Sequence, residues 1–165
     1  MNIFLPYEND IGASVKALDN ARLNKQIIEC MAIITASKGI TKGYRNHPIT
    51  VFYGDNLNFV YYYGFCCCRE YAYRFGKYHE MHWVLHQGAN PDGKMFVKQP
   101  DYTPYYMEGS KGQPNYIRTT ENVGELFRQK LIKKWNNDKV KSNGKNPKWT
   151  NRQVPEFYKK EMANG

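Results

Sequence analysis

The chain has 165 residues, of which 24 are Lys or Arg and 15 are Asp or Glu, so its formal net charge is +9. Apolar residues make up 41%, which is typical of a globular core rather than of a disordered chain. No apolar stretch approaches the ~20 residues that a membrane span needs, and the chain does not open with a basic-then-apolar export signal. The four cysteines, three of them adjacent at 66–68, form no disulfide framework. We therefore expect a protein that lies in the reducing cytoplasm and has no membrane partner.

The predicted elements are almost all helical. Apolar residues at helical spacing predict a first helix from Ser14 to Ser37. Pro48 suits the first position of a second helix, which Gly54 breaks. Further helices are expected from Asp55 or Asn56 to about Arg74, from His79 to His86, from Thr119 or Thr120 to near Trp135, and from Pro155 onward.

Two stretches lack this periodicity. Residues 88–114 contain eight Gly or Pro and predict a loop, which at this length is usually functional or disordered. The run rich in Asn and Lys over 136–148 predicts a mobile surface loop. We expect a mostly α, single compact domain over 1–165, divided into a helical core (1–87), a loop insertion (88–118) and a basic helix and tail (119–165).

The positive charge is concentrated in the last third of the chain. Residues 1–60 carry a net charge of +1 and residues 61–110 a net charge of zero, whereas residues 111–165 hold thirteen Lys or Arg and five Asp or Glu, a net charge of +8. Aromatic residues are interspersed among these cations. Cations attract phosphates and aromatic faces stack on bases, so the segment indicates a nucleic-acid contact. A solvated tail and a site for an acidic protein partner are the alternatives.

A polar arc on the first predicted helix is a candidate site. At ~100° per residue, Asp19, Arg22, Gln26 and Glu29 fall on one narrow face, with Lys25 at its edge. Carboxylates beside cations and an amide could bind phosphate, orient a water molecule or polarise a sugar oxygen. The alternative is an exposed helix face that binds nothing.

Two clusters contain histidine. Arg45 and His47 lie in the turn before Pro48, where backbone N–H groups at a helix start favour anions; ordinary capping is the alternative. His82 and His86 are four residues apart and could ligate a metal, but the spacing does not match the helical zinc-protease motif and no separated Cys-x-x-Cys completes a base-deaminase zinc site. Core or surface histidines are the alternative. We expect no metal site and no cofactor.

Several motifs together resemble a known family. They are Ile3-Phe4-Leu5-Pro6-Tyr7, Leu18-Asp19-x-x-Arg22-Leu23-x-Lys25-Gln26-x-x-Glu29, Tyr44-x-x-His47-Pro48 and Tyr63-Gly64-x-x-x-Cys68-x-Glu70-Tyr71-x-x-Arg74. The combination resembles small phage and bacterial proteins related to the pyrimidine-dimer DNA glycosylase family, over roughly residues 1–76. Beyond residue 80 the similarity is limited to the segment 127–133.

The resemblance implies a compact all-α fold that binds duplex DNA and extracts a nucleotide. The best-known members use the N-terminal α-amine as nucleophile at C1′, expel the base and cut the strand by β-elimination. An α-amine has a pKa near 8, so a usable fraction is neutral at physiological pH. The resemblance also implies that Arg22 binds phosphates.

The sequence departs from the family pattern at two positions. The residue after the helix Arg is a catalytic carboxylate in the family, but here it is Leu23. The family exposes its amine on a small residue after Met removal, but here the bulky Asn2 predicts that Met1 is retained. Three alternatives follow: Met1 supplies the amine, Asp19 or Glu29 replaces the acid, or the chemistry has changed.

The resulting expectation is an enzyme that resembles a base-excision DNA glycosylase, with or without lyase action, acting on a damaged or modified base in double-stranded DNA. A non-catalytic DNA-binding protein of the same fold and a metal-dependent nuclease built on His79, His82 and His86 are the alternatives. The candidate catalytic residues are Met1, Asp19, Arg22, Gln26, Glu29, His47 and Glu70. The candidate DNA contacts are Arg22, Lys25, Arg45, Lys130, Lys133, Lys134, Lys148 and Trp149.

Overall fold

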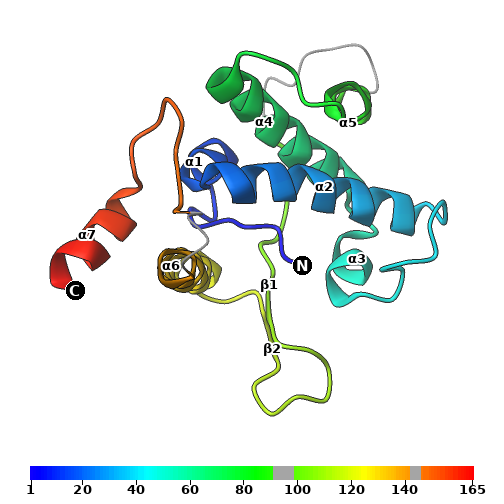
Figure 1. Cartoon of the computed structure of the whole chain (residues 1–165). Helices are drawn as coiled ribbons and strands as arrows, with labels where there is room; N and C mark the ends of the chain where they lie inside the picture. Colours follow the sequence, from blue (N-terminus) through cyan, green and yellow to red (C-terminus); the bar gives the residue numbers. More distant parts are fainter. Residues whose placement is uncertain (91–98, 142–145) are drawn as a thin grey trace.

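The computed structural model describes residues 1–90, 99–141 and 146–165, and this part of the chain is mostly helical, as predicted. It contains seven helices and one two-stranded antiparallel sheet (Figure 1). None of the helices in this part is both long enough and apolar enough to cross a membrane. The elements are α1 (Ile11–Ala17), α2 (Asn20–Ser37), α3 (Pro48–Tyr53), α4 (Leu57–Phe75), α5 (His82–Ala89), β1 (Tyr106–Glu108), β2 (Ile117–Thr119), α6 (Val123–Val140) and α7 (Glu156–Asn164).

The extended N-terminal segment lies at the centre of the packing. The α2 helix packs on α4, and α4 also contacts α1 and α5. Phe4 lies between this layer and α6: its N–H donates to Gln26 of α2 (2.8 Å), its carbonyl accepts from Tyr63 of α4 (2.8 Å), and its ring lies 5.3 Å from that of Phe127 in α6. The first residues of the chain are therefore buried between helices from both halves of the sequence (Figure 1).

The predicted helix over 14–37 is wrong in one respect, because the structure divides it into α1 and α2. Leu18 and Asp19 are extended at the break. The Asp19 carboxylate accepts a hydrogen bond from the Trp135 indole (2.9 Å), and the backbone N–H of Asn20 donates to the Lys148 carbonyl (2.8 Å). Contacts with the C-terminal third thus replace the intrahelical bonds that would continue one helix.

The other boundaries follow local chemistry more closely. Pro48 begins α3, Gly54 ends it and Asn56 precedes α4, all as predicted. The sequence misplaces α5, which covers 82–89 rather than 79–86, because the His79 ring accepts the N–H of Met81 and sets a turn there.

The C-terminal third contains two further differences. The α6 helix continues past Trp135 to Val140, into the run predicted as a loop, while 142–145 lie outside the described residues. β1 and most of β2 lie within the predicted loop insertion (88–118), where three-residue strands are too short to give a recognisable alternation. Because β2 ends at Thr119, the helix predicted to start at Thr119 or Thr120 begins only at Val123. Residues 91–98 of that predicted loop lie outside the described residues. Pro155 precedes α7, as predicted.

Gly88 in α5 allows a close approach to α4. A Cβ built on Gly88 would lie 2.1 Å from two ring atoms of Tyr61, and an aromatic ring cannot yield as a flexible chain end can. We expect Gly88→Ala to lower the free energy of unfolding by about 1–3 kcal/mol through overpacking. Urea denaturation followed by circular dichroism measures this change in the free energy of unfolding. Gly43→Ala, where an added Cβ meets nothing within 4 Å, is the control, and equal stabilities of the two variants would contradict the expectation.

Candidate functional site

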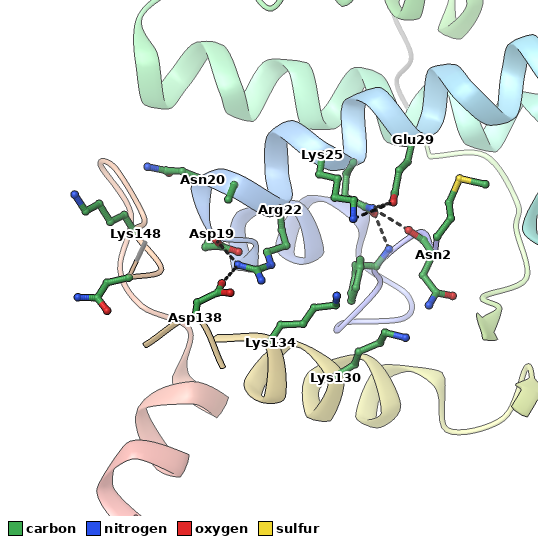
Figure 2. A pocket seen from close by; sticks show the side chains of 15 residues that line it. Asn2, Asp19, Asn20, Arg22, Lys25, Glu29, Lys130, Lys134, Asp138 and Lys148 are labelled. Atoms are coloured by element: carbon green, nitrogen blue, oxygen red, sulfur yellow. Dashed lines mark hydrogen bonds and ion pairs between the residues drawn. The ribbon is translucent and has the colours of Figure 1, made fainter. Parts of the chain in front are cut away.

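A polar cavity of about 610 Å³ lies between α2, α6 and the N-terminal segment (Figure 2). Residues between α6 and α7 also contribute to it, through Asn146 and Lys148. Its lining residues are Met1, Asn2, Phe4, Asp19, Asn20, Ala21, Arg22, Lys25, Gln26, Glu29, Lys130, Lys134, Asp138, Asn146 and Lys148. The cavity therefore joins the first 29 residues to the basic C-terminal third.

Helical spacing explains why these side chains converge. The polar arc predicted from the sequence lies on one face of α2 and lines the cavity, from Arg22 to Glu29. The facing helix α6 contributes Lys130, Lys134 and Asp138, which are four residues apart and also share one face. In Figure 2, Lys134 extends from α6 into the space between the two helices.

Asn2 holds the N-terminus in place through both its backbone and its side chain. Its carbonyl accepts from the Gln26 side chain (2.8 Å). Its amide side chain donates to the Met107 carbonyl (2.8 Å) and accepts from the Met107 N–H (3.0 Å), as a neighbouring strand would. Asn2 is only 3% exposed, so these bonds are shielded from water. The position of Met1 is therefore set through its neighbour Asn2, which is bonded both to α2 and to β1.

The N-terminal amine and Glu29 influence each other electrostatically. Burial lowers the pKa of the Met1 α-amine below its ordinary value; Glu29 raises it, and neighbouring lysines lower it again, with a downward net shift. Burial raises the pKa of Glu29, although the N-terminal charge, nearby lysines and a hydrogen bond from the Asn2 backbone oppose the increase. The site thus combines an amine that is more easily neutral than usual with a carboxyl group that is more easily protonated.

Gln26 connects these groups. Its amide nitrogen donates to Glu29 (2.7 Å) as well as to the Asn2 carbonyl, and its amide oxygen accepts from the Phe4 N–H and the Tyr63 hydroxyl (2.9 Å). Gln26 is 1% exposed, and both ends of its amide are hydrogen-bonded. It orients Glu29 and the N-terminal segment rather than presenting a free polar group.

Arg22 is held by two carboxylates. Its guanidinium lies 3.2 Å from Asp19 and also pairs with Asp138 of α6. Asp19 is 1% exposed and bonded to Trp135, so it belongs to the wall of the cavity, whereas the Asp138 side chain is 25% exposed. Sequence analysis missed Asp138, because its partner is 116 residues away and no local pattern connects them.

Lysines give the cavity its positive character. Burial lowers the pKa of Lys134, and Lys130, Lys25 and Arg22 lower it further, while Glu29 opposes them. Such mutual repulsion of cations is relieved when an anion such as phosphate enters. Lys25 and Lys148, two further predicted DNA contacts, also line the cavity.

Five predicted site residues lie outside the cavity lining. Glu70 is buried and accepts from Arg74 (2.8 Å) and Arg152 (2.8 and 2.9 Å), so it ties the C-terminal segment to α4. The Trp149 indole donates to the Ala17 carbonyl (2.9 Å) and its ring packs 4.9 Å from that of Trp135.

The remaining three are His47, Arg45 and Lys133. The His47 ring accepts the N–H of Ile49 (3.2 Å) and caps α3. Burial lowers the pKa of His47, and the N-terminal charge lowers it further, so His47 lies within electrostatic range of the amine. Arg45 is exposed in the turn before α3, and Lys133 is exposed on another face of α6.

The histidines of the nuclease alternative do not form a metal centre. Across the described ranges 1–90, 99–141 and 146–165, no three His, Cys, Asp or Glu side chains are grouped so that they could hold a metal ion. The His79 ring instead bonds Asn24 (3.1 Å) and the Met81 N–H, and His82 stacks on His86. The structure gives the nuclease alternative no support.

Comparison with known proteins identifies the family. The family model described as pyrimidine dimer DNA glycosylase matches residues 1–83, just over half of the chain. The chain belongs to the pyrimidine dimer DNA glycosylase family. The resemblance drawn from the motifs is thereby confirmed, and membership implies a DNA-repair function of the glycosylase kind, with DNA as substrate. Searches of curated proteins and of solved structures gave no match.

The family match covers one side of the cavity only. The N-terminus and the polar face of α2 lie within residues 1–83, whereas α6 with its lysines and the β1–β2 hairpin lie beyond them. Leu23, which stands where the resemblance implies a catalytic carboxylate, is fully buried in the hydrophobic core. The carboxylate that lies in electrostatic contact with the amine is Glu29, nearly two helical turns further along α2.

Proposed function

We propose that this protein is a DNA glycosylase that releases a damaged or modified base from duplex DNA, with the α-amine of Met1 as nucleophile. The observation that carries the proposal is the half-buried amine, whose pKa is lowered, in a cavity that also holds Glu29 and cations from two helices. A neutral amine is the reactive form, so burial beside lysines favours nucleophilic attack near neutral pH.

The proposed reaction starts with the target nucleotide turned out of the base stack into the cavity. The amine lone pair attacks C1′, the C1′–N bond breaks, and the base leaves with that electron pair and takes up a proton. The bound amine then loses a proton, and its lone pair forms the C=N bond as the C1′–O4′ bond breaks. The ring oxygen O4′ leaves with that electron pair and takes up a proton, which gives a protonated Schiff base. If lyase action follows, a general base of the protein removes a proton from C2′, and the 3′-phosphate leaves with the C3′–O electron pair.

Glu29 is the best candidate for the acid–base role. Its raised pKa lets it donate a proton to the departing base or to the sugar ring oxygen, and its carboxylate form could then accept the C2′ proton. Asp19 is less suited to this role, because it is bonded to Trp135 and Arg22 in the wall of the cavity. Gln26 would act as a positioning residue through its bond to Glu29.

The cations of the cavity would bind the phosphates beside the extruded nucleotide. Lys25, Lys130, Lys134 and Lys148 line the cavity from three separate segments. Arg22 would join them by exchanging Asp138, the more exposed of its two carboxylate partners, for a phosphate oxygen.

Borohydride trapping tests the proposal, because reduction fixes a Schiff base between protein and DNA. We expect adducts with duplexes that contain an abasic site, a pyrimidine dimer or a modified pyrimidine, mapping to the Met1 peptide by mass spectrometry. A two-residue N-terminal extension moves the amine by up to about 7 Å and should abolish the adduct, whereas the same extension at the C-terminus should not.

Failure has two distinguishable forms. An adduct on the ε-amine of Lys134, in the same cavity, would contradict the role of Met1. Absence of adduct and of base release across all substrates would favour a non-catalytic DNA-binding protein, the alternative suggested by the buried Leu23. That alternative predicts salt-dependent duplex binding that survives Glu29→Gln.

A further inference from the structure

We propose that the β1–β2 hairpin is a second DNA-contacting element, in which Ile117 packs against the base pair beside the extruded nucleotide and Lys111 contacts a flanking phosphate. The inference rests on the proposed function, since it assumes that duplex DNA lies over the adjacent cavity. It concerns a part of the chain outside the residues that match the family.

The hairpin projects from the helical body and has a defined turn (Figure 1). The two strands pair antiparallel, with Glu108 opposite Ile117. Gly109 and Gly112 have positive φ angles of 73° and 89°, which side chains disfavour. The Gln113 side chain accepts from the Ser110 N–H (3.0 Å), and its backbone N–H donates to the Ser110 carbonyl (3.0 Å). The projection is therefore built by local hydrogen bonds.

The base of the hairpin is joined directly to the cavity. Asn2 forms its two side-chain hydrogen bonds with the backbone of Met107 in β1. Lys130, which lines the cavity, lies 3.4 Å from the Glu108 carboxylate and 3.4 Å from the Met107 carbonyl. These contacts link the hairpin to the N-terminal amine and to α6 at once, so DNA bound at the cavity would pass beside the hairpin.

Ile117 is exposed at the edge of this junction. Directly opposed residues of an antiparallel pair project from the same face, so Ile117 shares a face with Glu108 and lies one strand away from Lys130. Its exposed fraction is 44%, which is high for a large apolar side chain in a strand. Apolar side chains of this kind insert between base pairs, where they compensate for the stacking lost when a nucleotide leaves the duplex.

The charges of the hairpin suit the same partner. Lys111 lies in the turn and is exposed, whereas Arg118, next to Ile117 in β2, projects from the opposite face, over the Tyr116 ring. Glu108 is neutralised by its ion pair with Lys130 and accepts a hydrogen bond from the Tyr106 hydroxyl. Glu121 follows β2 at the end nearer the helical body, away from the turn. The projecting part thus presents an exposed cation in the turn and an exposed apolar side chain in β2.

The test combines Lys111→Ala with Ile117→Ser and measures duplex binding by fluorescence anisotropy. We expect Kd for a duplex with an abasic site to rise about tenfold, and its dependence on salt to weaken by about one phosphate contact. A 2-aminopurine base beside the abasic site should show less unstacking when the variant binds. Borohydride trapping on a single-stranded abasic oligonucleotide should fall less than on the duplex, because no base pair has to be opened there and only the phosphate contact of Lys111 is lost.

Val84→Ser, in α5, and Lys77→Ala, between α4 and α5, provide the control, since both residues are exposed and α5 lies far from the hairpin (Figure 1). Circular dichroism and thermal unfolding establish that the variants are folded. Wild-type duplex binding by the hairpin variant would overturn the proposal, as would equal losses on duplex and single strand in a folded variant. If wild-type protein forms no adduct with any DNA, the proposed chemistry fails, but the comparison of duplex affinities still decides the role of the hairpin.

Discussion

Glu29→Gln is expected to lower the rate of base release by about 10²–10⁴-fold, the usual contribution of a positioned general acid–base group. Glutamine keeps the size of the side chain and can still accept from the Gln26 amide, so the local packing should persist. Single-turnover assays on a duplex containing the preferred lesion measure the effect. Unchanged duplex affinity would locate the loss in the chemical step.

The pH dependence of the same variant gives an independent readout. The Glu29 charge raises the pKa of the Met1 amine, so removing it should lower that pKa further. The residual trapping rate of Glu29→Gln should therefore reach its plateau at a lower pH than that of the wild type. Glu161→Gln, at an exposed position in α7, is the matched control. A rate and a pH profile equal to those of the wild type would remove Glu29 from the mechanism.

The second large effect concerns stability. Glu70→Ala is expected to lower the free energy of unfolding by about 3–5 kcal/mol, because it leaves the fully buried guanidinium of Arg74 without its carboxylate partner. It also releases Arg152, and with it the segment that packs against α4. Urea unfolding followed by circular dichroism measures the loss. Glu125→Ala breaks an exposed pair with Arg128 and should cost less than about 1 kcal/mol.

The contribution of Glu70 also has a defined pH window. Burial raises the pKa of Glu70, but hydrogen bonds from Arg152 and Arg74 outweigh it, and the net shift is downward. A carboxyl group with a lowered pKa stabilises the fold above its ordinary pKa, and this stability is lost as the pH falls through the folded value. The wild-type advantage over Glu70→Ala should therefore shrink on acidification. A difference that is constant down to the acid transition would contradict this assignment.

The elements that could be predicted are those set by local chemistry. Proline at the first position of α3 and glycine at its end act within one helical turn, so Pro48 and Gly54 mark real boundaries. Asn56 precedes α4 as predicted, but its side chain donates to the Asp101 carbonyl (3.2 Å) instead of capping the helix. The polar arc of α2 was predictable for the same reason, since the helical period alone places Arg22 and Glu29 on one face. The concentration of charge in the C-terminal third likewise pointed to the cations that line the cavity.

Long-range contacts decided the rest. The break before α2 depends on Trp135 and Lys148, more than a hundred residues away in the chain. The same holds for the pair of Arg22 with Asp138 and for the bonds of Asn2 to Met107. Glu70 carries the same charge as Glu29, yet its two arginine partners place it in a buried ion pair outside the cavity.

By itself, then, the sequence determined a mostly helical protein of the glycosylase family with a polar helix face and a basic C-terminal third. Only the tertiary structure decided which of these polar residues share a cavity with the N-terminal amine. The physical reason is that periodicity and capping act over a few residues, whereas burial and ion pairing depend on which distant segments the hydrophobic core brings together.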